Sequence, residues 1–303
     1  MSRLKAVAFL SGAAALALSA CNKDDEITAD DLPGGSVSDF TVVTYLPAPG
    51  QFINEPASGF NGVTSMQEAC DYAGSRLRNG DYVSLGAWGG IIVVRSSRPI
   101  ENSGEYDFAI AGNAFDTSNE PGIVWVMEDA NGNGEPDDVW YELRGSYYGR
   151  EGFQTGYWVT YYRPSADNED VMWKDSDGDT GFVRRNPFHR QASYYPAWVK
   201  EDSYTLYGSR LPEQVVQNPS TGVWSNEPFK WGYADNSGED SSLTQVDGKT
   251  VQKNFFRISD AVDADGNPVK LDRIHFIKVQ TAVNGSTEAT GENSTEVCGF
   301  YSW

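Results

Sequence analysis

The sequence predicts an all-β protein, a jelly-roll-like β-sandwich with one short helix. Short runs rich in β-branched and aromatic residues recur along the chain, separated by glycine, asparagine and proline, as in sandwiches and jelly rolls. Aromatic residues make up 13% of the 303 residues, which suits sheets that carry large side chains. We therefore expect residues 39–303 to form a single β-sandwich domain.

The expected elements can be placed in chain order. Strands are predicted at 40–45, 91–94, 106–111, 123–127, 157–162 and 274–281. The run 123–127 is continuously apolar, as in a buried strand, whereas 106–111 and 274–281 alternate between apolar and polar residues. One helix is expected over 64–78, with Thr64 or Ser65 as its N-cap and Gly80 just beyond its end.

The N-terminus predicts export and lipid attachment. Arg3 and Lys5 precede an apolar segment rich in alanine and leucine over 6–20, the pattern of a signal peptide. The run Leu18-Ser19-Ala20-Cys21 resembles a bacterial lipobox. This resemblance implies that residues 1–20 are a lipoprotein signal peptide and that Cys21 carries the lipid. An ordinary signal peptide that happens to contain a cysteine is the alternative.

Residues 21–38 read as an acidic flexible tether, because they contain Gly and Pro and lack an apolar period. The residues directly after Cys21, Asn22 to Glu26, resemble the surface-export signal of lipoproteins from a group of Gram-negative anaerobes. The resemblance implies a lipid-anchored protein on the outer membrane, facing outward at the cell surface. A solvated linker is the alternative.

Composition narrows the classes of partner and of site. The net charge of −20 repels phosphate backbones, so no nucleic-acid partner is expected, while the same excess of carboxylates suits divalent cations. Beyond the signal peptide, no apolar run is long enough to span a membrane. His189 and His275 are too few for a histidine-rich zinc site. Cys70 and Cys298 form either one disulfide or two separate buried thiols.

The segment 129–138, called the acidic loop below, is typical of a calcium site. Oxygen-bearing side chains alternate along it, and Gly134 permits a sharp turn. Trp140 stands where a bidentate glutamate is usual, and Asp138 or Glu142 is the candidate substitute. The candidate ligands are Asp129, Asn131, Asn133, Glu135, Asp137 and Asp138. The predicted cofactor is structural calcium; a hairpin turn that needs no metal is the alternative.

Two further acidic segments favour ordinary turns. Asp175, Asp177 and Asp179 alternate along the chain, and we expect a solvated turn there rather than a metal site. The segment 263–268 has the Asp-Gly-Asn-Pro chemistry of a turn.

Several stretches resemble a family of secreted and surface β-sandwich proteins, usually described only as cell surface proteins. They are PAPGQFIN (47–54), LGAWGGIIVV (85–94), 98–115, EPGIVWV and DANGNGEPDD within 120–143, WGYADN (231–236), and the tail with IHFIKVQTAVNG and STEVCGF. Some members accompany corrinoid-uptake systems of the outer membrane. The resemblance therefore implies capture of a nutrient, a corrinoid such as cobalamin being one candidate, for an outer-membrane transporter.

Aromatic residues are dense between 141 and 233, in stretches without clear strand alternation. On loops of a rigid sandwich they would stack on sugar rings or on a corrin face; packing in the core is the alternative. The candidates are Tyr147, Tyr148, Tyr194, Tyr195, Trp198, Trp224 and Trp231.

No catalytic motif is evident, so we expect a binding protein and not an enzyme. Four hypotheses follow from the residues and the resemblance. The first is capture of a corrinoid or another nutrient. The others are glycan binding by a calcium-supported, lectin-like sandwich, a protein-binding adhesion module, and a glycan-cleaving enzyme that uses paired carboxylates.

Overall fold

The computed structural model describes residues 39–246, 249–287 and 291–303. The predicted signal peptide, Cys21 and the tether lie outside the described residues. The elements are, in order, β1 (Phe40–Leu46), the 3₁₀ turn η3 (Pro56–Ser58), α1 (Met66–Arg78), β2 (Val83–Ser84), β3 (Ile91–Glu101), β4 (Phe108–Gly112), β5 (Gly122–Met127), β6 (Tyr141–Leu143), β7 (Gln154–Tyr162), β8 (Val171–Asp175), β9 (Thr180–Val183), β10 (Ser203–Arg210), β11 (Val215–Gln217), β12 (Trp224–Asn226), β13 (Ser241–Val246), β14 (Lys249–Phe256), the 3₁₀ turn η4 (Ile258–Asp260), β15 (Ala261–Val262), β16 (Arg273–Thr281), β17 (Ser286–Thr287), β18 (Gly291–Glu292), β19 (Glu296–Val297) and β20 (Gly299–Ser302).

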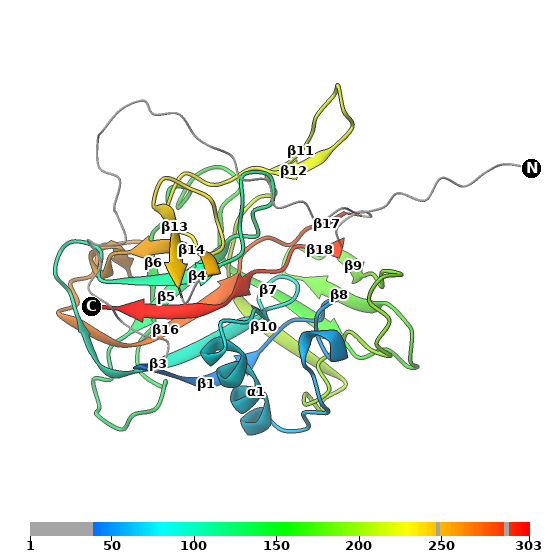
Figure 1. The fold of residues 1–303 in the computed structure, drawn as a ribbon, viewed down its shortest axis with the longest axis horizontal. Helices are drawn as coiled ribbons and strands as arrows, with labels where there is room; N and C mark the ends of the chain where they lie inside the picture. Colours follow the sequence, from blue (N-terminus) through cyan, green and yellow to red (C-terminus); the bar gives the residue numbers. More distant parts are fainter. Residues whose placement is uncertain (1–38, 247–248, 288–290) are drawn as a thin grey trace, which may run out of the picture.

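The fold is an all-β, sandwich-like arrangement of antiparallel sheets, as the sequence predicted (Figure 1). The largest sheet has the order β1-β3-β16-β5-β6-β15. Two four-stranded sheets, β10-β7-β8-β9 and β13-β14-β4-β20, pack with it. The hairpin of β11 and β12 projects away from the body (Figure 1).

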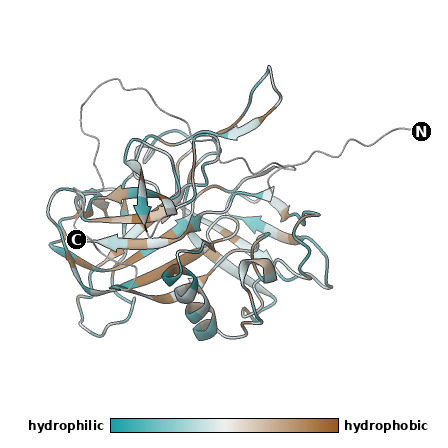
Figure 2. Cartoon of the chain, in the orientation of Figure 1, coloured by the Kyte–Doolittle hydropathy of each residue, from teal (hydrophilic) through white to brown (hydrophobic). Residues whose placement is uncertain are grey.

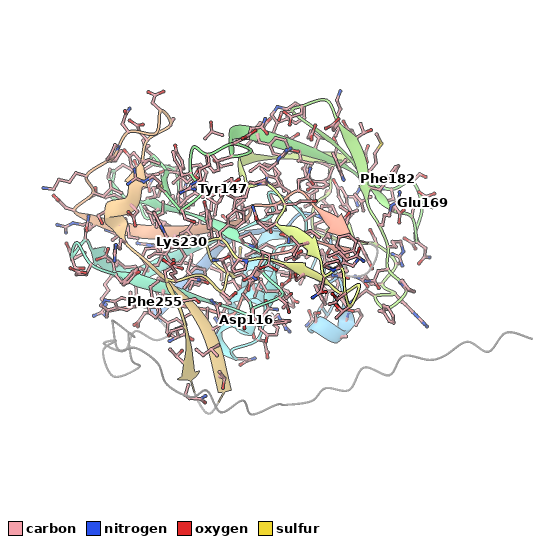
Figure 3. All side chains as sticks on the ribbon, turned by 90° about the horizontal axis from the view of Figure 1, so that it is seen from above. Asp116, Tyr147, Glu169, Phe182, Lys230 and Phe255 are labelled. Atoms are coloured by element: carbon pink, nitrogen blue, oxygen red, sulfur yellow. The ribbon has the colours of Figure 1, made fainter. Side chains whose placement is uncertain are left out.

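Side chains of the largest sheet and of the β7–β10 sheet share one core. Trp88 and Tyr157 are fully buried and pack edge to face, with ring centroids 4.6 Å apart. The buried Gln280 amide crosses between the sheets and donates to the Tyr207 carbonyl at 2.8 Å. Brown, apolar residues follow the central strands in Figure 2. Side chains fill the body in Figure 3, where Phe182 and Glu169 lie at the end formed by β8 and β9.

The helix begins and ends where the sequence predicted. The Ser65 hydroxyl accepts the Glu68 N–H at 3.2 Å, and the Glu68 carboxylate accepts the Thr64 N–H at 2.8 Å. Ala69, Ala73 and other small residues form the buried face that packs on β1. No helix in the described part of the chain is long and apolar enough to cross a membrane.

The two cysteines of the domain are separate buried thiols, so the disulfide alternative does not apply. Cys70 lies in α1, and Cys298 lies between β19 and β20. Burial raises the pKa of the Cys70 thiol.

Candidate functional site

Five segments that are far apart in the sequence line one cleft of about 470 Å³, called the aromatic cleft below. They are 51–52 after β1, 113–120 after β4, 186–189 after β9, 224–226 in β12, and Glu296 in β19. Its volume is in the range of small-molecule sites, which are commonly 300–1,000 Å³. Asn226 N–H donates to the Thr117 carbonyl at 3.1 Å, which fixes the base of the β11–β12 hairpin beside the cleft.

The rim of the aromatic cleft carries aromatic side chains that the core does not cover. Phe188 is 82% exposed and Trp224 is 49% exposed. Phe52 is half-buried and packs edge to face on His189, with ring centroids 4.7 Å apart. Large aromatic groups exposed around a concave surface are typical of ligand sites.

A histidine–glutamate pair fixes one wall. His189 Nδ1 lies 2.5 Å from Glu55 Oε1, and the Glu55 carboxylate also accepts the Ser58 hydroxyl at 2.7 Å. These bonds orient the imidazole ring against Phe52, so this part of the wall is preformed.

Three carboxyl groups, two of which line the aromatic cleft, lie close together and are called the carboxyl floor below. One oxygen each from Glu120, Asp235 and Glu296 lies within 4.8 Å of the others. Backbone groups orient them: Asp235 accepts the N–H groups of Asn113 at 2.8 Å and of Glu296 at 2.9 Å, and Glu120 accepts the Ser294 N–H at 3.0 Å. Glu120 and Glu296 line the cleft, whereas Asp235 is buried and is not part of the lining.

Desolvation dominates the electrostatics of the carboxyl floor. Burial raises the pKa of Glu120 to about 7. Burial and then repulsion from Glu120 raise the pKa of Asp235 to about 8. The pKa of Glu296 is raised well above its ordinary value by burial and then by the other two carboxyls. Because one oxygen of each carboxyl lies within 4.8 Å of the others, ionisation of one carboxyl opposes ionisation of its neighbours.

The aromatic cleft and its floor draw on five of the stretches that carry the family resemblance. Phe52 belongs to PAPGQFIN, Asn113 to 98–115, Glu120 to EPGIVWV, Asp235 to WGYADN and Glu296 to STEVCGF. Sequence reasoning missed the carboxyl floor. The available signal was an acidic residue in each of three separate stretches, but spacing along the chain does not reveal that they meet.

The acidic loop brings most of its predicted ligands together. Asp129 accepts the Gly134 N–H at 3.0 Å, and Asn131 and Asn133 each accept the N–H two residues further on. The Asp137 carboxylate accepts both asparagine amides at 3.0–3.2 Å.

Around this network, the Asp138 carboxylate accepts the N–H of Ala130 at 2.9 Å, and the Glu135 N–H donates to the side-chain oxygen of Asn133. His275 Nδ1 accepts the Asp129 N–H at 3.0 Å. The Lys278 ammonium lies over the rings of Trp125 and Trp140, which flank the loop, at 4.4 and 4.8 Å. The loop is thus a compact turn whose side-chain oxygens accept N–H groups of the loop itself.

The predicted aromatic ligand-binding residues separate into two groups. Tyr194, Tyr195 and Trp198 are buried in the main core, which corrects the expectation that they face a ligand. The segment after β9 folds back on the domain: Trp198 Nε1 donates to the Tyr45 carbonyl and the Tyr195 hydroxyl donates to the Glu201 carbonyl.

The remaining predicted aromatics lie nearer the surface. Trp224 lines the aromatic cleft. Trp231 is half-buried and lines a second cavity of about 290 Å³ together with Arg144, Arg257 and Asp240. Tyr147 and Tyr148 are half-buried and pack on other aromatic rings. The structure therefore does not bring the predicted set into one site.

The other acidic segments are turns with different degrees of burial. The Asp175 side chain is buried, which corrects the expectation of a solvated carboxylate. It accepts the N–H groups of Asp177 and Asp179 and the Tyr157 hydroxyl at 2.5 Å. Asp263 accepts the N–H groups two and four residues further on, which confirms the predicted turn.

Comparison with known proteins assigns no family. No protein-family model matches the chain. No curated protein matches it closely enough to count as a relative.

Proposed function

We propose that the protein is a binding protein on the outside of a cell, anchored through lipid on Cys21, and that its ligand site is the aromatic cleft. The observation that carries the proposal is the convergence of five separate segments on one preformed cleft with exposed Phe188 and Trp224 at its rim. Exposed aromatic rings contribute binding free energy only when a ligand covers them. We propose that the protein binds its ligand and does not catalyse a reaction on it.

The ligand that the family resemblance implies is a nutrient such as a corrinoid, passed on to an outer-membrane transporter. A corrinoid presents a flat conjugated ring and peripheral amide groups. The rings of Phe188 and Trp224 suit the flat surface, and Asn113, Asn186 and the carboxyl of Glu120 suit the amides. A corrinoid is larger than the cleft, so the cleft would hold one edge of it.

A second candidate is a glycan. Beside Trp224 the cleft presents the hydroxyls of Thr117, Ser118 and Ser225, and an aromatic ring flanked by hydroxyl and amide groups suits a sugar ring. On this alternative, calcium in the acidic loop would support the sandwich. The alternating oxygen-bearing side chains of the loop, which its turn gathers into one hydrogen-bonded network, favour such a role for the loop.

The two candidates separate in one experiment. The full chain, purified in detergent, is incubated with cyanocobalamin and passed through a desalting column, and the same preparation is applied to a glycan array. Red colour retained on the protein, and lost in the Phe188→Ala, Trp224→Ala double variant, supports the corrinoid. Glycan binding that the same variant loses supports the second candidate. Binding of neither ligand contradicts the proposal.

Anchoring has its own test. Wild-type protein is expected in the membrane fraction and accessible to protease added to intact cells. The Cys21→Ser variant is expected in the soluble fraction. A variant that stays with the membrane would contradict attachment through Cys21.

A further inference from the structure

We propose that the second cavity, which Arg144, Trp231, Asp240 and Arg257 help to line, binds a small zwitterion, a free amino acid with an apolar side chain. The ligand carboxylate lies against the two guanidinium groups, and the ligand ammonium group lies against the Asp240 carboxylate. The second cavity shares no lining residue with the aromatic cleft, so the two sites are independent.

Five segments that are distant in the sequence build the second cavity, whose volume is about 290 Å³. They are Tyr106 before β4, 143–144 at the end of β6, 231–232, 239–240 before β13, and 255–260 at the end of β14 and in η4. This volume is at the lower end of the range for ligand sites, so it suits a molecule of amino-acid size.

Hydrogen bonds join these segments to one another. The Arg144 N–H donates to the Asp260 carbonyl at 2.9 Å, and the Phe255 N–H donates to the Asp240 carbonyl at 3.0 Å. The Gly232 N–H donates to the Asp240 carboxylate at 2.7 Å. The walls are therefore preformed, and a ligand does not have to order them.

One carboxylate oxygen of Asp240 has no partner within the chain. The exposed fraction of Asp240 is 6%, yet this residue lines the cavity. Its Oδ2 accepts the Gly232 N–H, whereas its Oδ1 is buried and accepts no hydrogen bond from the described residues. The nearby Asn254 amide donates to the Asn236 carbonyl at 2.6 Å, not to Oδ1. A buried carboxylate with an unpaired oxygen is costly, and a ligand ammonium group supplies both a donor and the opposite charge.

Two arginines supply positive charge in the same cavity. Arg144 and Arg257 are exposed, and neither guanidinium group forms an ion pair or a side-chain hydrogen bond with the part of the chain that the structure describes. The guanidinium carbon of Arg257 lies 4.4 Å from the centre of the Tyr106 ring, which orients this side chain. Burial raises the pKa of Asp260, and Arg257 and then Arg144 oppose that rise, so both charges act on one region of the cavity. The N–H groups of a guanidinium match the two oxygens of a carboxylate.

The remaining lining selects the kind of amino acid. Trp231 is half-buried, and the rings of Tyr106 and Phe255 pack together with centroids 5.7 Å apart (Figure 3 labels Phe255). These rings suit an apolar side chain. A ligand without a carboxylate would bring a positive charge to the two arginines, and a ligand without an ammonium group would leave Asp240 unpaired. The zwitterion therefore fits better than either.

The test uses the full chain, purified in detergent, at pH 8. Burial raises the pKa of Asp240 to about 7, so the carboxyl is ionised at this pH. L-phenylalanine, hydrocinnamate, which lacks the ammonium group, and phenethylamine, which lacks the carboxylate, are titrated separately by isothermal calorimetry. We expect L-phenylalanine to bind and each analogue to bind at least tenfold more weakly.

Two variants test the assigned contacts. Asp240→Asn keeps the acceptor for the Gly232 N–H and removes the charge, and Arg257→Gln removes one guanidinium group. Each should weaken the binding of L-phenylalanine at least tenfold. Arg98→Gln is the matched control, because Arg98 is exposed on β3 and lies outside the cavity; it should bind as the wild type does.

The thermal midpoint of each variant, measured alongside, shows that it is folded. No binding of L-phenylalanine by the wild type, equal binding of hydrocinnamate, or unchanged affinity in the folded Asp240→Asn protein would overturn the proposal. None of these results involves Phe188 or Trp224, so the ligand test of the aromatic cleft stands apart from this one.

Discussion

Replacing Asp240 with asparagine should stabilise the protein at alkaline pH and leave it unchanged at acid pH. Asp240 lines the second cavity, its exposed fraction is 6%, and one oxygen accepts the Gly232 N–H at 2.7 Å. Burial raises its pKa from 3.8 to about 7 against the effect of that hydrogen bond. Asparagine keeps the acceptor and removes the charge.

The sign follows from proton linkage. Between about pH 4 and 7 the folded chain holds the Asp240 proton and the unfolded chain does not. The stability that the folded chain gains by holding the Asp240 proton is therefore fully present below about pH 4 and is lost as the pH rises through about 7. The difference between a pKa of 3.8 and one of about 7 corresponds to about 4 kcal/mol at most. At pH 8 the Asp240→Asn protein should melt higher by roughly 10 °C.

The assay is the thermal midpoint measured from pH 4 to 9 for the wild type, Asp240→Asn and Glu239→Gln. Glu239 is the matched control, because its side chain is 67% exposed and forms only a surface ion pair with Lys230 at 3.5 Å. Its replacement should change stability by less than about 1 kcal/mol at any pH. Identical pH profiles for the wild type and Asp240→Asn would refute the reasoning.

Three other predictions concern stability. Gly90→Ala should prevent folding, because its Cβ would lie 1.7 Å from a backbone oxygen, whereas Gly74→Ala in α1 should stabilise the folded protein by up to ~1 kcal/mol. Soluble yield and urea denaturation check both substitutions. A normally folded Gly90→Ala protein would contradict the packing around Gly90. Chelator should lower the melting temperature, and Asp129→Ala should abolish that response. An unchanged melting temperature in chelator would contradict a calcium site in the acidic loop. Tyr157→Phe should cost about 1–3 kcal/mol in urea denaturation, since it removes the donor to the buried Asp175 carboxylate; an unchanged midpoint would mean that water replaces this hydrogen bond.

Local patterns in the sequence predicted the fold class, the helix and the central strands. The apolar run 123–127 is β5 in the middle of the largest sheet, and the alternating run 274–281 is β16 beside it. The helix could be predicted because the residues that form its N-cap are close in sequence: Ser65 and Glu68 are three residues apart. Periodicity and capping need no knowledge of distant contacts, so they succeed from sequence alone.

Features that depend on long-range contacts escaped prediction. The strand β10 was missed because its burial comes from pairing with β7, and the tyrosines 194 and 195 were misplaced because their loop folds back into the core. The carboxyl floor escaped because Glu120, Asp235 and Glu296 belong to distant segments. Where several loops meet is a property of the whole topology, and no local pattern encodes it.

The most direct test of the aromatic cleft as the ligand site is the dissociation constant for cyanocobalamin, measured with variants of exposed phenylalanines. Phe188→Ala should weaken binding about tenfold, equivalent to about 1.4 kcal/mol. Phe182→Ala is the matched control, because Phe182 is 48% exposed on β9 and lies outside the cleft; it should bind as the wild type does. Equal affinity of the two variants, or no binding by the wild type, would contradict the account.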